Sequence, residues 1–244
     1  MKNIIEVNNV SFEYITDENT LKAIDNLDLQ VKEGEFVAII GHNGSGKSTL
    51  SKNLNAILFP TEGNILINKM DTREEDKLWD IRQTAGMVFQ NPDNQIVATV
   101  VEEDVAFGPE NLGIEPNEIR KRVEESLKSV GMYELRDRQP HLLSGGQKQK
   151  VAISSTLVYD TKIIFFDEPS SNLDYRGIVE LKNILEKLKS LGKTIIISEH
   201  RLFYLNDLYD RFLYMKDGKI EKVFKKGELT EEDCKNYSLR TTNY

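Results

Sequence analysis

The chain has 244 residues, with 32 Lys and Arg against 40 Asp and Glu, a formal net charge of −8 at pH 7. Hydrophobic residues make up 39% and charged residues 30%, a balance typical of a globular protein with one sizeable core. The acidic balance argues against a surface covered in nucleic-acid-binding cations. The single cysteine, Cys234, excludes an internal disulfide framework and an all-cysteine metal site. We expect it to be an inert surface or tail thiol.

The apolar runs of the sequence are short, such as those at 36–40 and 163–166. None approaches the roughly 20 residues that a membrane-spanning helix requires. The N-terminal residues lack the apolar core of a secretion signal. We therefore expect a chain that stays in the cytosol and does not itself span a membrane.

Short apolar runs predict four strands in the first 90 residues of the chain, at residues 4–14, 26–31, 35–40 and 85–89. The third strand is expected to be buried and ends at Gly41, and a helix is expected to begin near Lys47. From about residue 92 to residue 158 the pattern becomes helical. One apolar face at helical spacing is formed there by Ile119, Val123, Leu127 and Val130.

Buried strands are predicted again at residues 161–166 and 194–198. An amphipathic helix between them is marked by Ile178, Leu181, Leu185 and Leu188. This alternation of strands and helices predicts an α/β fold with a mainly parallel central sheet. The helical stretch in the middle is interpreted as an inserted subdomain.

A phosphate-binding loop follows the strand that ends at residue 40. The pattern G-x-x-x-x-G-K-[ST] is matched by Gly41, His42, Asn43, Gly44, Ser45, Gly46, Lys47 and Ser48. Glycines let main-chain N–H groups approach phosphate oxygens, and the following helix presents its positive end. Lys47 is expected to reach the β- and γ-phosphates, Ser48 to hold Mg²⁺ and Thr49 to add a hydroxyl near the α-phosphate. The alternative is a chance match, expected about once in a hundred chains of this length.

Two acids, Asp167 and Glu168, end the apolar strand at 163–166. Charges at the end of a buried strand are costly unless they have a partner or a function. In P-loop enzymes the first acid helps to hold Mg²⁺, and the second can act as general base toward the attacking water. The alternative is a strand that ends in a polar turn, for which Pro169 is well suited.

A second candidate anion site lies in the stretch Leu143, Ser144, Gly145, Gly146 and Gln147. Adjacent glycines ahead of a helical run would let the serine hydroxyl and the helix N-terminus face a γ-phosphate. The alternative is an ordinary N-cap, in which Ser144 caps the helix that covers residues 147–158.

Together, the phosphate loop, the Leu-Ser-Gly-Gly-Gln stretch and the run Asp-Glu-Pro-Ser-Ser-Asn-Leu-Asp resemble the ABC ATPase family from about residue 3 to residue 225. The resemblance implies ATP and Mg²⁺ as ligands and an antiparallel N-terminal β part beside the parallel P-loop core. It implies a single ABC ATPase domain over residues 1–244. Within it we place a helical subdomain at about 92–158 and a short C-terminal tail at about 226–244.

Further roles follow from the same resemblance. Tyr14 resembles the aromatic residue that stacks on adenine, although a plain strand aromatic is the alternative. Gln90 resembles the glutamine that senses Mg²⁺, the attacking water and the membrane partner. Asp174 resembles an aspartate that contacts the opposite subunit, and His200 resembles the switch histidine that contacts the γ-phosphate.

In this family the Leu-Ser-Gly-Gly-Gln stretch of one subunit covers the ATP that the other subunit holds. The resemblance therefore implies a dimer with the same chain or with a similar, distinct ATPase. It also implies a position at the cytoplasmic face of the cell membrane. A transmembrane coupling subunit and a substrate-binding membrane subunit are the expected partners, and no nucleic acid is.

Residues 91–97 and 99–109 resemble the region that accepts coupling helices in energy-coupling factor importers, which implies import of a vitamin or transition-metal ion. The alternative is an ordinary helix whose apolar residues fill the subdomain core. Five features depart from the family pattern. Ser170 replaces the usual threonine, Lys150 replaces arginine, serines at 154 and 155 replace small apolar residues, the stretch from Glu199 differs from the usual Thr-His-Asp while keeping the histidine, and only 44 residues follow His200. The short tail weakens the case for a permanent dimer. Another ABC transporter subgroup, a non-transport ABC ATPase and a nucleotide-binding regulator are the competing functions.

Overall fold

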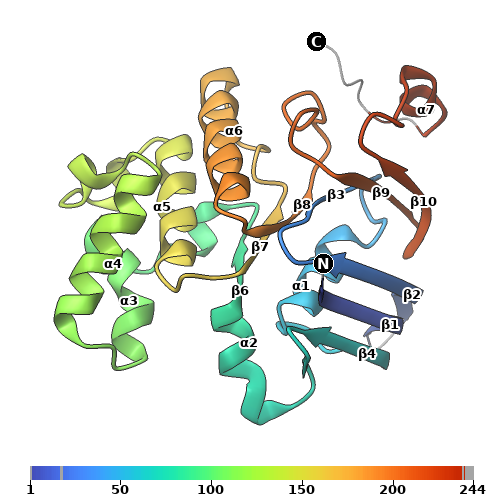
Figure 1. Cartoon of the computed structure of the whole chain (residues 1–244), viewed down its shortest axis with the longest axis horizontal. Helices are drawn as coiled ribbons and strands as arrows, with labels where there is room; N and C mark the ends of the chain where they lie inside the picture. Colours follow the sequence, from blue (N-terminus) through green and yellow to red (C-terminus); the bar gives the residue numbers. More distant parts are fainter. Residues whose placement is uncertain (1, 17–18, 238, 240–244) are drawn as a thin grey trace.

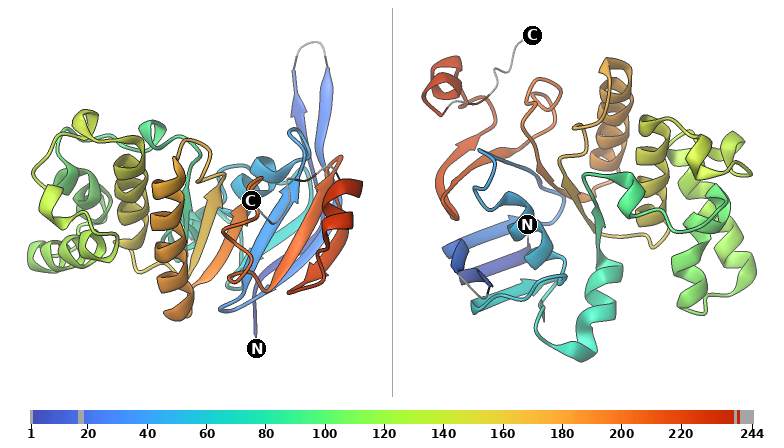
Figure 2. Two further views of the ribbon diagram at one scale, coloured as in Figure 1. Left: turned by 90° about the horizontal axis from the view of Figure 1, so that it is seen from above. Right: turned by 180° about the vertical axis from the view of Figure 1, so that it is seen from behind.

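The computed structural model describes residues 2–16, 19–237 and 239, and its strands form two sheets (Figure 1). One is an antiparallel sheet in the order β2-β1-β4-β5. Its strands are β1 (Asn3–Ile15), β2 (Thr20–Lys32), β4 (Glu62–Ile67) and β5 (Met70–Asp71). The paired strands β1 and β2 project beyond the rest of the described chain near Ile15 and Thr20 (Figure 2).

The second sheet has the order β10-β9-β3-β8-β7-β6. All neighbours in it are parallel except the hairpin of β9 and β10. Its strands are β3 (Phe36–Gly41), β6 (Ala85–Val88), β7 (Ile163–Asp167), β8 (Thr194–Ser198), β9 (Arg211–Lys216) and β10 (Lys219–Lys225). The mainly parallel core sheet and the antiparallel N-terminal part are thus confirmed.

Each face of the parallel sheet contributes to a different hydrophobic core. In β3, Val37 and Ile39 pack toward helix α1 (Lys47–Leu54) and the antiparallel sheet. The side chains of Phe36, Ala38 and Ile40 pack on the opposite face, toward the helices between residues 101 and 190. Successive side chains of a strand point to opposite faces, so a strand covered on both sides must be apolar throughout. This explains why the run at 36–40 shows no alternation with polar residues.

The helices cover both faces of the sheet and extend it at one end. They are α1 (Lys47–Leu54), α2 (Leu78–Thr84), α3 (Val101–Asn111), α4 (Pro116–Ser129), α5 (Gly145–Leu157), α6 (Tyr175–Ser190) and α7 (Glu231–Asn236). Helices α3, α4 and α5 gather on the side of α6 that faces away from the antiparallel sheet (Figure 1). Residues 92–158, all of them described, contain helices and turns but no strand. The structure therefore has the inserted helical part that the sequence predicts.

Helix α4 illustrates how the local sequence specifies an element. The carboxylate of Glu115 accepts hydrogen bonds from the main-chain N–H groups of Asn117 and Glu118, at 3.0 and 3.2 Å, and Pro116 occupies the first helical position. Both features are typical of a helix N-terminus. Ile119 and Val123 are buried as the apolar spacing predicts, which attaches the helix to the core.

Several element boundaries differ from the predicted ones. The strand expected at 26–31 is longer and begins at Thr20, because its first half pairs with β1 in a hairpin. The strand expected at 161–166 begins at Ile163, where pairing with β8 starts, and includes Asp167. Strands β4, β5, β9 and β10 and helices α2 and α7 were not predicted from the sequence.

The expectation that Cys234 is a surface thiol is wrong. Its side chain is fully buried on the inner side of α7. Directly after this helix, the ring of Tyr237 packs against that of Tyr214, with centroids 4.3 Å apart and the planes tilted by 46°. An amphipathic helix that docks on the β9–β10 hairpin thus turns part of the predicted tail into ordered structure. The last five residues of that tail lie outside the described residues. None of the described helices combines the length and apolarity that a bilayer crossing demands.

Candidate functional site

The loop between β3 and α1 has a backbone that depends on glycine at two positions. Gly41 has φ 153°, and a Cβ there would lie 2.2 Å from the carbonyl oxygen of Met215. Gly46 has φ 102°, and its Cβ would lie 2.4 Å from the carbonyl oxygen of Ala23. Only glycine fits at such positions. The loop therefore turns tightly at the end of β3, and the N-terminus of α1 points into the loop.

Lys47 is the first residue of α1, and its side chain, only 4% exposed, reaches back into this loop. Its ammonium group donates to the carbonyl oxygens of Gly41 and His42, both at 3.0 Å, and lies 3.9 Å from Oε1 of Glu168. Burial lowers the pKa of Lys47, while the carboxylates of Glu168 and Asp167 oppose this effect. The loop thus wraps around a buried cation that lies close to Glu168.

Asp167 is the last residue of β7 and is buried. One carboxylate oxygen accepts hydrogen bonds from the hydroxyls of Ser48, at 2.9 Å, and Ser198, at 2.7 Å. A hydroxyl and a carboxylate are the hard oxygen donors that Mg²⁺ prefers, and Mg²⁺ usually takes few protein ligands because it retains water and binds substrate phosphates. The residues present therefore fit this ion. Within the described part of the chain, no group of three or more His, Cys, Asp or Glu side chains is placed to hold a metal by itself.

Glu168 follows in the left-handed backbone region, with φ 45°, and its N–H donates to the carbonyl oxygen of Ser198 at 3.0 Å. Its carboxylate accepts from the side-chain amide of Gln90 at 3.2 Å and lies 2.8 Å from Nε2 of His200. The hydrogen bond from His200 lowers the pKa of Glu168, and burial acts against it. Side chains at the ends of β6, β7 and β8 thus meet at one carboxylate.

Tyr14 lies near the start of α1. Its hydroxyl is 3.2 Å from Oγ1 of Thr49, and its ring meets the edge of Phe12 with centroids 4.9 Å apart. The tyrosine is 37% exposed. A partly open aromatic ring therefore lies beside the loop, where a flat ligand ring can stack on it.

Ser144 and Asp174 both cap helices. The hydroxyl of Ser144 accepts from the N–H of Gln147 at 3.3 Å, and the Gln147 side chain accepts from the N–H of Ser144 at 2.9 Å. Asp174 accepts from the N–H of Gly177 at 2.7 Å. The capping role that the sequence left open for Ser144 is thus present, although α5 begins earlier, at Gly145. A capping hydroxyl keeps its own proton, so Ser144 remains able to donate to a ligand.

Two separate cavities hold the predicted site residues. One, of about 610 Å³, is lined by Gly41, His42, Asn43, Glu168 and His200 among others. The other, of about 560 Å³, is lined by Ser144, Gly145, Gly146, Gln147 and Asp174 among others. No residue lines both. The structure therefore brings the loop, the acids, Gln90 and His200 together but leaves the Ser144 stretch apart from them within one chain.

Ser198 was missed in the sequence analysis. It is fully buried, its hydroxyl bonds to Asp167, and its carbonyl accepts from the N–H of Glu168. The signal available was a polar residue at the end of an otherwise apolar strand, two positions before His200. Ser198 orients both acids.

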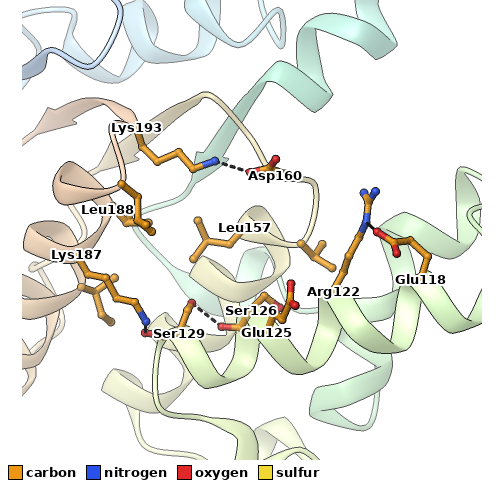
Figure 3. Close-up of a pocket in the computed structure, with 13 residues that line it drawn as sticks. Glu118, Arg122, Glu125, Ser126, Ser129, Leu157, Asp160, Lys187, Leu188 and Lys193 are labelled. Atoms are coloured by element: carbon orange, nitrogen blue, oxygen red, sulfur yellow. Dashed lines mark hydrogen bonds and ion pairs between the residues drawn. The ribbon is translucent and has the colours of Figure 1, made fainter.

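The cavities outside this site include two that lie between helices. One, of about 290 Å³, opens between α4, α5 and α6 (Figure 3). Four of its charged side chains form ion pairs, Arg122 with Glu118 at 2.7 Å and Lys193 with Asp160 at 2.6 Å, and Lys187 donates to the carbonyl oxygen of Ser129 at 3.3 Å. The other, of about 880 Å³, lies between α2 and α3, and the exposed rings of Trp79 and Phe107 line it.

A glycine loop between β3 and α1, a buried lysine and two acids at the end of β7 define a P-loop nucleotide-binding ATPase. The model of the ABC transporter family matches residues 24–171. The energy-coupling factor transporter ATP-binding protein EcfA1 of Clostridioides difficile (strain 630) is 67% identical, over 90% of this chain and 79% of the relative. The EcfA1 protein of Clostridium novyi (strain NT) is 53% identical over the same shares.

Solved structures agree with these relatives. The cbiO1 protein of Clostridium perfringens, part of the ABC transporter complex cbiONQ, superimposes with a TM-score of 0.85 and 37% identity over 96% of this chain and 93% of its own. The ATP-binding cassette MJ0796, in a dimeric post-hydrolysis state bound to ADP and Pi, gives a TM-score of 0.82 and 34% identity, over 91% and 98%. The chain therefore belongs to the ABC transporter family, among its energy-coupling factor ATPases.

Proposed function

We propose that the chain hydrolyses ATP to drive import of a micronutrient, a vitamin or a transition-metal ion, through an energy-coupling factor transporter. One observation supports the proposed ATP hydrolysis. Lys47, Asp167, Glu168, Gln90 and His200 converge at the ends of neighbouring strands, with Glu168 in contact with both Gln90 and His200. This is the arrangement that cleavage of a terminal phosphate requires.

The phosphate chain of ATP would lie along the loop at 41–48, within reach of the main-chain N–H groups and of Lys47. Ser48 and Asp167 would hold Mg²⁺, with the oxygen of Gln90 as a further ligand, and the ion would neutralise charge on the phosphates. Tyr14 would stack on adenine beside Thr49. These assignments are supported by contacts already present, since Ser48 bonds to Asp167, Gln90 bonds to Glu168 and the Tyr14 hydroxyl lies 3.2 Å from Thr49.

Glu168 would accept a proton from the attacking water, because its lowered pKa keeps it ionised at neutral pH. Gln90, in contact with Glu168, would orient the same water. His200 would donate a hydrogen bond to the γ-phosphate. Backbone contacts with Ser198 hold Glu168 in place while these groups act.

A second ABC ATPase protomer, of the same or a similar kind, would complete the site. Ser144, Gly145, Gly146 and Gln147 would cover the γ-phosphate held by the partner, and Asp174 would contact the partner beside it. The separation of the two cavities within one chain supports this arrangement, as does the dimeric state of MJ0796. Because ATP adds contacts that exist only in the closed pair, binding would close the pair and hydrolysis would open it.

The cavity between α2 and α3 would accept a helix of the transmembrane coupling subunit, with Trp79 and Phe107 as apolar contacts. The chain would then lie at the cytoplasmic face of the membrane, peripheral to it, with a substrate-binding membrane subunit in the same complex and no nucleic acid. We assign residues 1–244 to one ATPase domain, with a helical subdomain at about 92–158 and a tail at about 226–244.

Purification of the tagged chain from membranes of its source organism tests this function. The proposal requires a small multi-span membrane subunit in the purified complex and ATP hydrolysis that stops when EDTA removes Mg²⁺. Recovery of the chain with ribosomes or nucleic acid and without membrane proteins would refute the transport role. Hydrolysis that persists in EDTA would refute the Mg²⁺ assignment.

A further inference from the structure

Glu199 is a buried carboxylate that no established role explains. It lies between Ser198 and His200 and is 2% exposed. Its Oε1 atom accepts from the main-chain N–H groups of His200, at 2.7 Å, and Arg201, at 3.1 Å. Its Oε2 atom accepts from the hydroxyl of Tyr204 at 2.5 Å. Three donors from the five residues that follow thus surround one charge.

Burial of a carboxylate costs free energy unless its oxygens accept hydrogen bonds. Tyr204, itself buried, is well suited to donate one, because burial first and the Glu199 charge second hold the pKa of its hydroxyl well above the ordinary value. The tyrosine therefore stays a donor across the physiological range. Since all three donors follow Glu199 directly in sequence, the chain from 199 to 204 must curl around the carboxylate.

The curled segment is fastened to the rest of the site at three points. The N–H of Glu199 donates to the carbonyl oxygen of Ile39 at 3.1 Å, two residues before the phosphate loop begins. The ring of His200 reaches Glu168, and the guanidinium of Arg201 donates to the carbonyl oxygen of Leu173 at 3.2 Å. The segment thus joins the phosphate loop, the general base and the turn before Asp174.

We propose that Glu199, held by Tyr204, is a positioning residue for hydrolysis: its carboxylate sets the backbone of residues 199–201 so that the His200 ring meets Glu168. The inference rests on the proposed role of His200. Glu199 is among the residues that line the cavity of about 610 Å³, but both of its carboxylate oxygens accept hydrogen bonds from its own loop, so we assign it an effect through the backbone. Its removal would free the N–H groups of His200 and Arg201 and let the His200 ring leave Glu168.

Four variants separate positioning from general stability, measured in the assembled ATPase with MgATP. Glu199→Ala removes both acceptor atoms and should lower kcat by about tenfold to a hundredfold, because small displacements of a catalytic group have large effects. Glu199→Gln keeps an acceptor for the two N–H groups and should restore much of that loss. Tyr204→Phe removes only the hydroxyl and should lower kcat. In all three the KM for ATP should stay near the parental value.

Tyr209→Phe is the matched control. Tyr209 is a buried tyrosine five residues after Tyr204, and its hydroxyl accepts from the N–H of Gly227 at 3.0 Å. Its loss should lower stability to a similar degree as Tyr204→Phe while leaving kcat unchanged. An equal fall of kcat in the two tyrosine variants would mean that Glu199 and Tyr204 act only through stability.

The imidazole resonance of His200 gives a readout that does not depend on turnover. The chain has three histidines, and His200→Ala assigns the signal by difference. We expect the signal to move in Tyr204→Phe and in Glu199→Ala but not in Tyr209→Phe. A signal unchanged in Tyr204→Phe would overturn the proposal even if Glu199→Ala fails to fold.

The His200→Ala background distinguishes this inference from the proposed function. If Glu199 acts through His200, adding Glu199→Ala to His200→Ala should lower kcat no further. A further fall of the same size as in the parent would overturn the positioning role. Parental hydrolysis by His200→Ala alone would instead refute the catalytic assignment of His200, while the resonance would still decide whether Glu199 positions its ring.

Discussion

The imidazole of His200 lies 2.8 Å from the carboxylate of Glu168, although 32 positions separate the two residues in sequence. They meet because β7 and β8 are adjacent parallel strands that end at the same edge of the sheet. The contact fixes one carboxylate oxygen and lowers the pKa of Glu168. The folded chain thus holds an oriented carboxylate with a lowered pKa 3.9 Å from the ammonium group of Lys47, which is what the proposed general base requires.

Replacing Glu168 by glutamine should abolish turnover without abolishing nucleotide binding. The amide keeps the size of the side chain but cannot accept a proton from water, and loss of a general base costs about a hundredfold to ten-thousandfold in rate. Phosphate release and fluorescent nucleotide binding are the measurements. Glu186→Gln, at an exposed position of α6, is the control. A parental rate in Glu168→Gln would rule out Glu168 as the base.

The same residue makes a prediction about stability and pH. Because the folded-state pKa of Glu168 lies below its ordinary value of 4.5, the ionised side chain stabilises the fold above that pH. This contribution is lost as the pH falls through the lower, folded-state pKa. Urea unfolding should therefore show the parent gaining stability relative to Glu168→Gln between pH 3 and pH 6. An unchanged or reversed difference would contradict the pKa direction.

The sequence was sufficient for the site residues that belong to contiguous motifs. The loop at 41–48 and the acids at 167 and 168 lie where apolar strands end, and parallel pairing brings those ends together. The hydrogen bonds that orient Asp167 and hold Glu199 could not be predicted, because their partners Ser198 and Tyr204 belong to no motif. Their roles depend on which strand lies beside β7 and on how the chain curls after β8.

The fold was predictable where a strand or helix is apolar on its own. Strand β3 was predictable because it is covered on both faces and is therefore apolar throughout. Helix α6 was predictable because its buried residues form a single apolar stripe. By contrast, β10 is largely exposed and has only Phe224 buried, so its formation depends on pairing with β9. Similarly, Cys234 is buried only because α7 docks on that hairpin.

Helix α6 provides a test of the core. Leu185 is fully buried against the sheet, so Leu185→Ala should lower the free energy of unfolding by about 2–5 kcal/mol. Val179 on the same helix is 41% exposed, and Val179→Ala should change it by less than about 0.5 kcal/mol. Chemical denaturation measures both. Equal effects of the two substitutions would contradict the assigned packing of α6.

The groove between α2 and α3 should be needed for coupling but not for ATP chemistry. Phe107 is half exposed there, and Phe107→Asp places a charge where an apolar helix would dock. We expect loss of the membrane subunit on purification and loss of transport, with nucleotide binding retained. Leu191→Asp, at an exposed position after α6, should change neither. An intact complex in Phe107→Asp would place the membrane contact elsewhere.

The claim that ATP is shared between two protomers is tested most directly by sedimentation of Glu168→Gln protein, which retains bound ATP. With MgATP the account predicts a two-protomer species holding two nucleotides, and without it the separate protomers. Adding Ser144→Arg, which places a bulky cation where the partner's phosphates would lie, should prevent association while each protomer still binds ATP. A Glu168→Gln protein that binds MgATP and remains a single protomer at every concentration, or a Ser144→Arg double variant that associates normally, would contradict the shared site.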